Sequence, residues 1–108
     1  MSGLGPAFLV IQGQLKPGGE PAYRQYLAGT RPLLEQYAGE IVAVGEGVPS
    51  AHTSEHWPIN AMLRFPSREA ADGFLADPGY LLIKQAYRDV AYDTLHLSLF
   101  VGRPPRAL

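Results

Sequence analysis

The chain has 108 residues, 46% of them hydrophobic, and a formal net charge of −1. This size and composition predict a single domain over residues 1–108, with a core at about 7–102 and a flexible tail at 103–108. The near-neutral charge argues against nucleic acid as a partner. The absence of cysteine excludes disulfides, thiolate metal sites and thiol catalysis.

The amino-terminal residues lack the features of a targeting segment. The apolar run Ala7–Ile11 is short and follows no basic residues, so we expect no signal peptide. No stretch approaches the roughly 18 apolar residues that a membrane helix requires. We therefore expect no membrane association and a cytoplasmic location.

A strand and a helix are predicted at the beginning of the chain. Residues Ala7–Leu15 are rich in β-favouring side chains and alternate with glutamines, which indicates a strand. A helix is predicted from near Glu20, with apolar residues at helical spacing. Because proline removes a backbone hydrogen bond, Pro32 is expected to kink the helix or split it near Gly29. Gly39 is expected to cap its carboxyl end.

The second and third strands are separated by a polar loop. Residues Glu40–Val48 read as a strand, with a bulge near the glycines at 45 and 47. The loop from Pro49 to Pro58 carries two histidines and the tryptophan. Residues Ile59–Phe65 alternate again and predict the third strand.

Two helices and a last strand complete the chain. Ser67 is the expected cap of one helix, and Asp77, followed by proline, is the expected cap of the next. The second of these helices should bury a stripe made of Leu82, Ile83, Ala86, Tyr87 and Val90. Residues Tyr92–Val101 form the last predicted strand. The order βαββαβ predicts an α+β, ferredoxin-like sandwich: one antiparallel sheet with helices on one face.

Alternation along the strands divides the sheet into two faces. The apolar face carries Leu9, Ile11, Leu15, Ile59, Ala61, Leu63, Phe65, Leu95, Leu97, Leu99 and Val101. The mixed face carries Phe8, Val10, Gln12, Gln14, Asn60, Met62, Arg64, Thr94, His96, Ser98 and Phe100. The apolar face must lie under the helices. The mixed face is too apolar for a plain solvent-exposed surface, so we expect a second copy of the chain to cover it and form a homodimer. An exposed sheet with scattered apolar residues is the alternative.

Several short motifs resemble a known family in their order and spacing. The most specific is the run Arg64-Phe65-Pro66-Ser67-Arg68-Glu69-Ala70-Ala71, followed by Phe74-Leu75, Asp77-Pro78-x-Tyr80 and Arg88, and preceded by Tyr23, Tyr26, Pro32 and Gly39. Over roughly Phe8–Gly102 the chain resembles the family called domain of unknown function 1330. The resemblance implies a dimeric α+β barrel fold. It implies no agreed activity.

The chain departs from that family at positions where a ligand role would be expected. Val44-Gly45-Glu46 replaces an Arg-Gly-Gly group, and Ile59-Asn60 replaces a basic residue at the start of the third strand. The wider group with this fold includes cofactor-free monooxygenases, muconolactone isomerases and haem-degrading enzymes, which is an analogy of fold alone.

Candidate functional residues come from both helices and strands. His96 is the candidate catalytic group, because a histidine can act as general acid or base near neutral pH, although a hydrogen-bonded interface histidine is the alternative. We expect a small-molecule pocket lined by Tyr26, Trp57, Asn60 and Arg64.

The loop histidines suggest a cover for such a pocket. His52 and His56 flank a glutamate at a spacing that suits a metal only on a helix, and prolines bound their segment. We therefore expect them on a loop over the pocket, with no metal and no other cofactor. The expected function is small-molecule binding or cofactor-free catalysis of the monooxygenase or isomerase type. The alternative is a non-catalytic dimer that serves as a ligand sensor or an assembly subunit.

Overall fold

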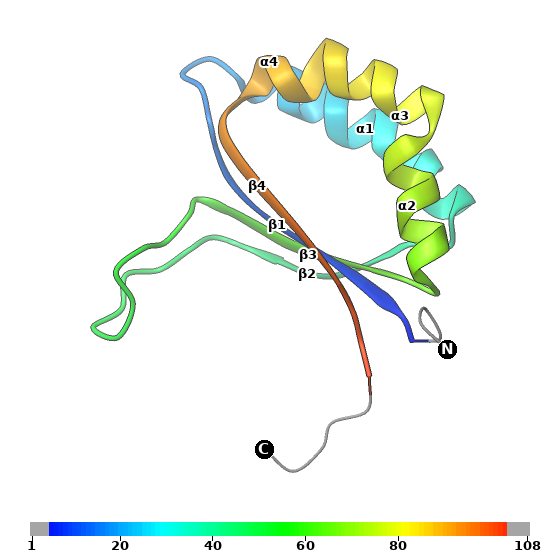
Figure 1. Ribbon diagram of the computed structural model, residues 1–108. Coiled ribbons are helices and arrows are strands. Elements are labelled where there is room, and N and C mark those ends of the chain that lie inside the picture. Colours follow the sequence, from blue (N-terminus) through cyan, green and yellow to red (C-terminus); the bar gives the residue numbers. More distant parts are fainter. Residues whose placement is uncertain (1–4, 104–108) are drawn as a thin grey trace.

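The computed structural model describes residues 5–103 (Figure 1). In chain order it contains β1 (Ala7–Leu15), α1 (Glu20–Gln36), β2 (Glu40–Gly45), β3 (Ile59–Phe65), α2 (Arg68–Ala76), α3 (Pro78–Ile83), the π-helical segment η1 (Lys84–Arg88), α4 (Asp89–Ala91) and β4 (Tyr92–Val101). The predicted bounds of three strands agree with the structure, and the second strand ends at Gly45 rather than Val48. Of the expected flexible tail at 103–108, residues 104–108 lie outside the described residues.

The strands form one four-stranded sheet in the order β2-β3-β1-β4. Every neighbouring pair is antiparallel, and β1 lies between β3 and β4. A register shift in β2 lies between Ile41 and Ala43 rather than at the glycines where a bulge was predicted. The topology confirms the ferredoxin-like α+β arrangement predicted from the order of elements.

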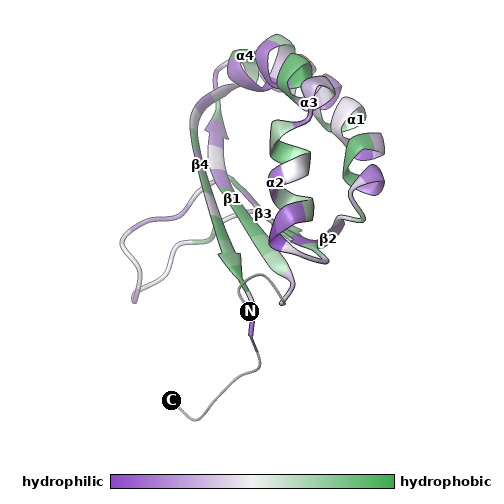
Figure 2. Ribbon diagram, turned by 45° about the vertical axis from the view of Figure 1, so that its right-hand side comes forward, coloured by the Kyte–Doolittle hydropathy of each residue, from purple (hydrophilic) through white to green (hydrophobic). Residues whose placement is uncertain are grey.

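The helices lie together on one side of the sheet, over the face that the alternation predicts as apolar (Figure 1). Figure 2 shows hydrophobic residues along the strands and along the helices that cover them. The core comprises Ala7, Leu9, Leu34, Leu63, Phe65, Ala71, Phe74 and Tyr80. Phe65 is fully buried, and its ring centroid lies 5.4 Å from that of Phe74. Packing of α2 onto the sheet therefore closes one end of the helix layer.

Helix α1 runs unbroken through Pro32, so the predicted kink or break near Gly29 is wrong. Proline removes the hydrogen bond to the carbonyl of Ala28, and both residues are exposed, so that carbonyl can be solvated. Gly29 instead allows a close helix contact. A Cβ at this position would lie 3.0 Å from Cδ1 of Ile83 on α3.

The carboxyl end of α1 also differs from the prediction. Ala38, with φ of 55°, adopts the left-handed conformation that was expected at Gly39. The amide N–H of Gly39 donates to Leu34 at 2.8 Å, and that of Ala38 donates to Glu35 at 3.0 Å, which is the Schellman pattern. Gly39 is needed for space, because a Cβ there would lie 2.8 Å from the Phe65 ring.

Both predicted helix caps are confirmed. Ser67 Oγ accepts a hydrogen bond from the amide of Ala70 at 3.1 Å, and Asp77 Oδ1 accepts one from Gly79 at 2.7 Å. The stripe predicted for the following helix is wrong in part, since Leu82, Ala86 and Val90 are exposed. The π-helical turn at Lys84–Arg88 inserts an extra residue and changes which side chains face the sheet.

Candidate functional site

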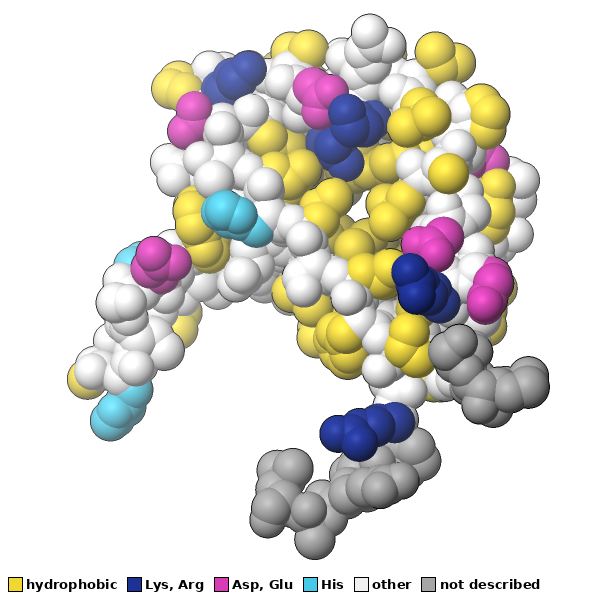
Figure 3. Space-filling view, in the orientation of Figure 1, with side chains coloured by type: hydrophobic (Ala, Val, Ile, Leu, Met, Phe, Trp, Pro, Cys, Tyr) yellow, Lys and Arg dark blue, Asp and Glu magenta, His cyan; other side chains and the backbone are white. Residues whose placement is uncertain are grey.

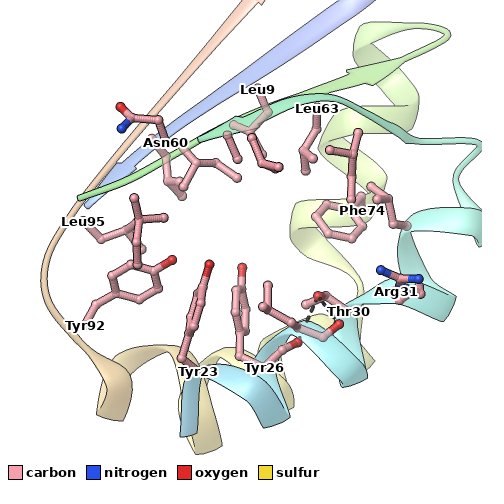
Figure 4. Close-up of a pocket in the computed structure, with 18 of the residues that line it drawn as sticks. Leu9, Tyr23, Tyr26, Thr30, Arg31, Asn60, Leu63, Phe74, Tyr92 and Leu95 are labelled. Carbon is pink, nitrogen blue, oxygen red and sulfur yellow. Dashed lines mark hydrogen bonds between the residues drawn. The ribbon is translucent and has the colours of Figure 1, made fainter. Parts of the chain in front are cut away.

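A cavity of about 420 Å³ lies between the helices and the apolar face of the sheet. Aliphatic side chains of the strands form its floor, among them Leu9, Ile11 and Leu63. Tyr23 and Tyr26 project from α1 toward the strands, and Tyr92 closes one side (Figure 4). The cavity is therefore apolar over most of its wall, with phenol hydroxyls on the helix side.

The cavity is open along the edge of the sheet that β2 forms. Ile41 and Val44 line it and are 52% and 70% exposed, because the helices do not reach over this strand. Leu27 and the exposed Arg31 line the opposite wall on α1. Figure 3 shows a hollow in this layer lined mainly by hydrophobic side chains, with basic and acidic side chains beside it. A small molecule could enter here without unfolding any element.

A hydrogen-bonded cluster lies at the helix side of the cavity. The hydroxyl oxygens of Tyr26 and Tyr80 lie 3.0 Å apart, and Nη1 of Arg88 donates to the Tyr80 hydroxyl at 2.9 Å. The guanidinium carbon of Arg88 also lies 5.9 Å from the centroid of the Tyr80 ring. Only 12% of the Arg88 side chain is exposed. The cluster connects α1, α3 and the π-helical turn.

An adjoining hollow of about 390 Å³ is lined by Arg88, which does not line the first cavity. The two share Tyr92, Leu95 and Leu97 as wall residues. Asp89 also lines the second hollow, and its Oδ1 lies 3.5 Å from Nε of Arg88. That contact lacks hydrogen-bond geometry, so the buried Nε has no hydrogen-bond partner among the described residues.

The hydroxyls of Tyr26 and Tyr92 remain protonated over the ordinary pH range. Burial, and then the neighbouring Tyr80, raises the pKa of the Tyr26 hydroxyl far above its usual value. Burial, and then Tyr23, raises the pKa of Tyr92 in the same direction. These hydroxyls therefore act as neutral hydrogen-bond donors and acceptors, not as phenolates.

The structure brings only some of the predicted pocket residues together. Tyr26 and Asn60 line the cavity, and Trp57 and Arg64 do not. The Asn60 side chain points away from it (Figure 4), donating to the carbonyl of Trp57 at 2.7 Å and accepting from Gln12 at 3.1 Å. Arg64 lies on the mixed face, exposed, with Nη1 3.6 Å from Oε1 of Glu40. A pocket between the sheet and helices cannot include side chains from the far face of the sheet.

His96 also lies on the mixed face, in the same cross-strand row as Gln12 and Asn60. It is exposed, and the ring centroid of Trp57 lies 4.9 Å from its own in an edge-on arrangement. His96 and Trp57 thus form a pair on the mixed face and do not line the cavity.

The loop that carries His52 and His56 extends away from the helix layer (Figure 1). Both histidines are exposed, and no residue of Glu46–Pro58 lines the cavity. The predicted position over the pocket is therefore corrected: the backbone of this loop continues the β2–β3 hairpin, and Gly47 donates to the carbonyl of Trp57 at 2.8 Å. Within residues 5–103, no group of three or more metal-ligating side chains is close enough to hold an ion.

The candidate site residues predicted from the sequence did not include Arg88, Tyr80, Tyr92 or Tyr23. The spacing of the tyrosines along the first helix is a sequence signal for such a cluster. Their rings pack on the apolar face, and their hydroxyls then require hydrogen-bond partners. No local signal reveals the π-helical turn that directs Arg88 toward them. No helix among the described residues is long and apolar enough to cross a membrane.

Solved structures with the same fold cover most of the chain. A protein of unknown function from Rhodopseudomonas palustris is 23% identical, with a TM-score of 0.80, over 94% of this chain and 85% of that one. A dimeric ferredoxin-like protein of unknown function from Jannaschia sp. CCS1 is 13% identical, with a TM-score of 0.71, over 91% and 100%.

A third similar structure has an activity in its name. SnoaB, a cofactor-independent oxygenase from Streptomyces nogalater, is 18% identical, with a TM-score of 0.59, over 94% of this chain and 96% of its own. No curated protein matches the sequence. The model of the family described as domain of unknown function DUF1330 matches residues 6–98, and the chain belongs to that family.

Proposed function

We propose that the protein binds a small, mainly apolar molecule in the cavity between the helices and the sheet. The main observation behind this proposal is a cavity of about 420 Å³ that is open at the β2 edge. It has an aliphatic floor on the sheet, and tyrosine hydroxyls lie opposite that floor. Cavities of this size with a few convergent polar groups are the usual form of small-molecule sites. A cysteine-free chain needs no oxidising compartment, and we propose the cytoplasm as its location.

Cofactor-free catalysis in this cavity is an extension of the same proposal. The fold similarity to SnoaB, a cofactor-independent oxygenase, supports it. Phenols that stay neutral can hydrogen-bond to a substrate oxygen that gains charge during a reaction. The alternative, a sensor without catalysis, uses the same cavity and differs only in the absence of turnover.

A thermal-shift screen with a cavity-filling variant tests the proposal. A ligand at about 100 times its dissociation constant stabilises by about 2.7 kcal/mol, which moves the melting temperature of a domain this size by several degrees. Ala61→Phe fills the cavity from its floor, and Leu27→Trp narrows it from the half-exposed rim. Ala28→Phe places the same ring on the exposed side of α1 as a control.

The proposal is supported if the same ligands stabilise the wild type and Ala28→Phe but do not stabilise the two filling variants. It is contradicted if a broad library of apolar metabolites gives no shift, or if the shifts persist in both filling variants.

We further propose that the protein is a homodimer associated through the mixed face. Phe8 and Phe100 stack there at a centroid distance of 5.1 Å, and Phe100 remains 47% exposed. Val10 and Met62 lie beside them in the register of β1 and β3. Covering this face with a second copy would bury an area on the order of 800 Å² per subunit, an ordinary value for a dimer. Similar structures are described as dimeric.

Sedimentation velocity tests the association. Met62→Asp places a charge at the centre of the mixed face, and we expect it to convert a dimer into a monomer. Leu82→Asp, at a position that is 69% exposed on α3, is the matched control and should remain dimeric. A monomeric wild type, or a dimeric Met62→Asp variant, would contradict association through this face.

A further inference from the structure

We infer that the ligand of the cavity carries a neutral carbonyl oxygen, which accepts a hydrogen bond from the hydroxyl of Tyr26, on an otherwise apolar body. This inference rests on the proposed binding function and specifies its ligand class.

A series of hydrogen bonds leads from Arg88 to the cavity wall. Nη1 of Arg88 donates to the Tyr80 hydroxyl at 2.9 Å, and the hydroxyl oxygens of Tyr80 and Tyr26 lie 3.0 Å apart. A guanidinium only donates, so Tyr80 accepts in the first bond, and its own hydrogen is free for the second. Tyr26 then accepts from Tyr80, and the hydroxyl hydrogen of Tyr26 remains for a further acceptor. Because consecutive hydrogen bonds polarise one another, the charged donor at the start strengthens the donor at the end.

Tyr26 is the member of this series that a ligand can reach. It is only partly buried, lines the cavity, and points from α1 toward the strands (Figure 4). Tyr80 is 2% exposed, and Arg88 does not line the cavity. Burial, and then the neighbouring Tyr80, raises the pKa of Tyr26 and keeps its hydroxyl protonated. The cavity wall therefore presents a neutral O–H donor at this point.

The rest of the wall favours a neutral ligand group over a charged one. Among the described residues that line the cavity, Arg31 alone is charged, and it is exposed at the rim. An anion beside Tyr26 would lose its hydration without gaining a cationic partner, which is costly.

The spare hydrogen of Tyr26 also selects the kind of neutral group. A carbonyl oxygen accepts without donating, so it complements this hydrogen, whereas a ligand hydroxyl would bring a hydrogen that needs an acceptor of its own. The hydroxyl of Thr30 does not compete for the carbonyl, because it donates to the backbone oxygen of Tyr26 at 2.9 Å. The ligand class is therefore an apolar ketone, aldehyde or related carbonyl compound.

Two isosteric probes test the carbonyl contact by calorimetry: 2-acetylnaphthalene and 2-isopropenylnaphthalene, in which a CH₂ group replaces the oxygen. The ratio of their affinities is compared between the wild type and each variant, so the different hydrophobicity of the two probes cancels. A neutral hydrogen bond typically changes affinity by about two- to tenfold. Tyr26→Phe should weaken ketone binding by this factor and leave hydrocarbon binding nearly unchanged. Tyr37→Phe, at a hydroxyl that donates to Asp77 outside the cavity, is the matched control and should keep the wild-type ratio.

Two further tyrosine variants test which hydroxyl donates. Tyr80→Phe removes the bond to Tyr26 but leaves the Tyr26 hydrogen, so it should change the ratio less than Tyr26→Phe does. Tyr23 also lines the cavity, and Tyr23→Phe should change the ratio less as well. If either of these variants removes the preference for the ketone while Tyr26→Phe retains it, another hydroxyl holds the carbonyl and the inference is overturned.

Infrared spectroscopy of the bound ketone tests the same contact in the wild type, without relying on a variant that folds. The carbonyl stretch should lie at a lower frequency in the complex than in an alkane solvent, and Tyr26→Phe should return it toward the alkane value. A stretch in the wild-type complex that equals the alkane value would overturn the inference.

A third probe, 2-naphthoate, tests the preference for a neutral group. It should bind the wild type at least about tenfold more weakly than the ketone, because its charge would be desolvated without a partner. Equal or tighter binding of 2-naphthoate would overturn the inference.

The outcomes also separate this inference from the proposed function. If both naphthalene probes bind and Tyr26→Phe leaves their affinity ratio unchanged, the carbonyl contact is overturned and the cavity remains a binding site. Binding of none of the probes would count against both.

Discussion

On the mixed face of the sheet the polar side chains are paired with one another, whereas on the apolar face phenol hydroxyls lie on the wall of a cavity. Gln12 donates to Asn60, Asn60 donates to the carbonyl of Trp57, and Arg64 lies near Glu40. Tyr26 and Tyr80 line the cavity, and their hydroxyl oxygens lie 3.0 Å apart. Polar groups that are satisfied by the protein stabilise it, while groups left with spare donors are available to a ligand. This difference supports the proposed association through the mixed face and the proposed binding at the apolar one.

The largest expected contrast concerns stability. Phe65→Ala, at the fully buried centre of the apolar face, should lower the free energy of unfolding by about 3–5 kcal/mol, because it leaves a cavity in the core. Phe100→Ala removes a stacked ring from the mixed face and should cost a monomer about 1 kcal/mol. Urea unfolding measures both changes. If both substitutions lowered the free energy of unfolding equally in a monomeric variant, such as Met62→Asp, the two faces would contribute alike to stability.

The next contrast concerns Asn60, which lines the cavity although its amide is hydrogen-bonded on the other side of the sheet. Asn60→Leu should cost about 1–2 kcal/mol, because it leaves Gln12 without its partner on a partly buried surface. Ligand affinity should be unchanged, because the amide points away from the cavity. Urea unfolding and calorimetry give the two values. A large loss of affinity at unchanged stability would contradict the assignment.

Tyr26→Phe should show the opposite pattern. The change removes one hydroxyl from the Tyr26–Tyr80 pair, while Arg88 still donates to Tyr80, so the stability cost should be about 1 kcal/mol or less. Affinity for a cavity ligand that bears a hydrogen-bonding group should fall several-fold, because a hydroxyl is lost from the cavity wall. The same two measurements apply. Unchanged affinity would remove Tyr26 from the site.

The smallest effect on ligand binding and association is expected for the hydrogen-bonded pair Tyr37 and Asp77, because neither residue lines the cavity or lies on the mixed face. Tyr37 donates to Oδ2 of Asp77 at 2.6 Å, and this bond, followed by the amide of Gly79, lowers the pKa of the Asp77 carboxyl. The folded state favours the carboxylate, so this contribution to stability is present above the ordinary aspartate pKa of about 4. It is lost as the pH falls through the lower folded value.

Tyr37→Phe should therefore raise the pKa of Asp77 toward its ordinary value, as an NMR titration of the carboxyl carbon would measure. Ligand binding and association should not change. An unaltered pKa would show that the hydrogen bond from Tyr37 is not the main cause of the shift.

Alternation of residue types made the strands and their two faces predictable. Period-two patterns locate Ala7–Leu15, Ile59–Phe65 and Tyr92–Val101 because one face must be buried. The same pattern already predicts that Arg64 and His96 lie on the face of the sheet opposite to the one that α1 covers. The hypothesis that grouped them with Tyr26 in one pocket combined residues from opposite faces.

The rest of the site depends on packing that no local pattern encodes. Arg88 reaches the Tyr80 hydroxyl from a π-helical turn that adds a residue to the helix, and the apolar spacing at 82–90 instead predicts an ordinary α-helical stripe. Likewise, Ala38 rather than Gly39 takes the left-handed conformation, because Gly39 is required by its close approach to Leu34 and Phe65. Both deviations arise from tertiary contacts between segments distant in sequence.

One NMR experiment tests the division of roles between the two faces most directly. The chain has a single tryptophan, whose indole N–H reports on the mixed face, while the backbone amide of Ala61, a residue of the cavity floor, reports on the cavity. In a titration of the ¹⁵N-labelled protein with a ligand that raises its melting temperature, we predict a saturable shift of the Ala61 amide and of other cavity amides, with the Trp57 indole unmoved. A saturable shift of the Trp57 indole with unchanged cavity amides would place binding on the mixed face and contradict the proposed division of roles.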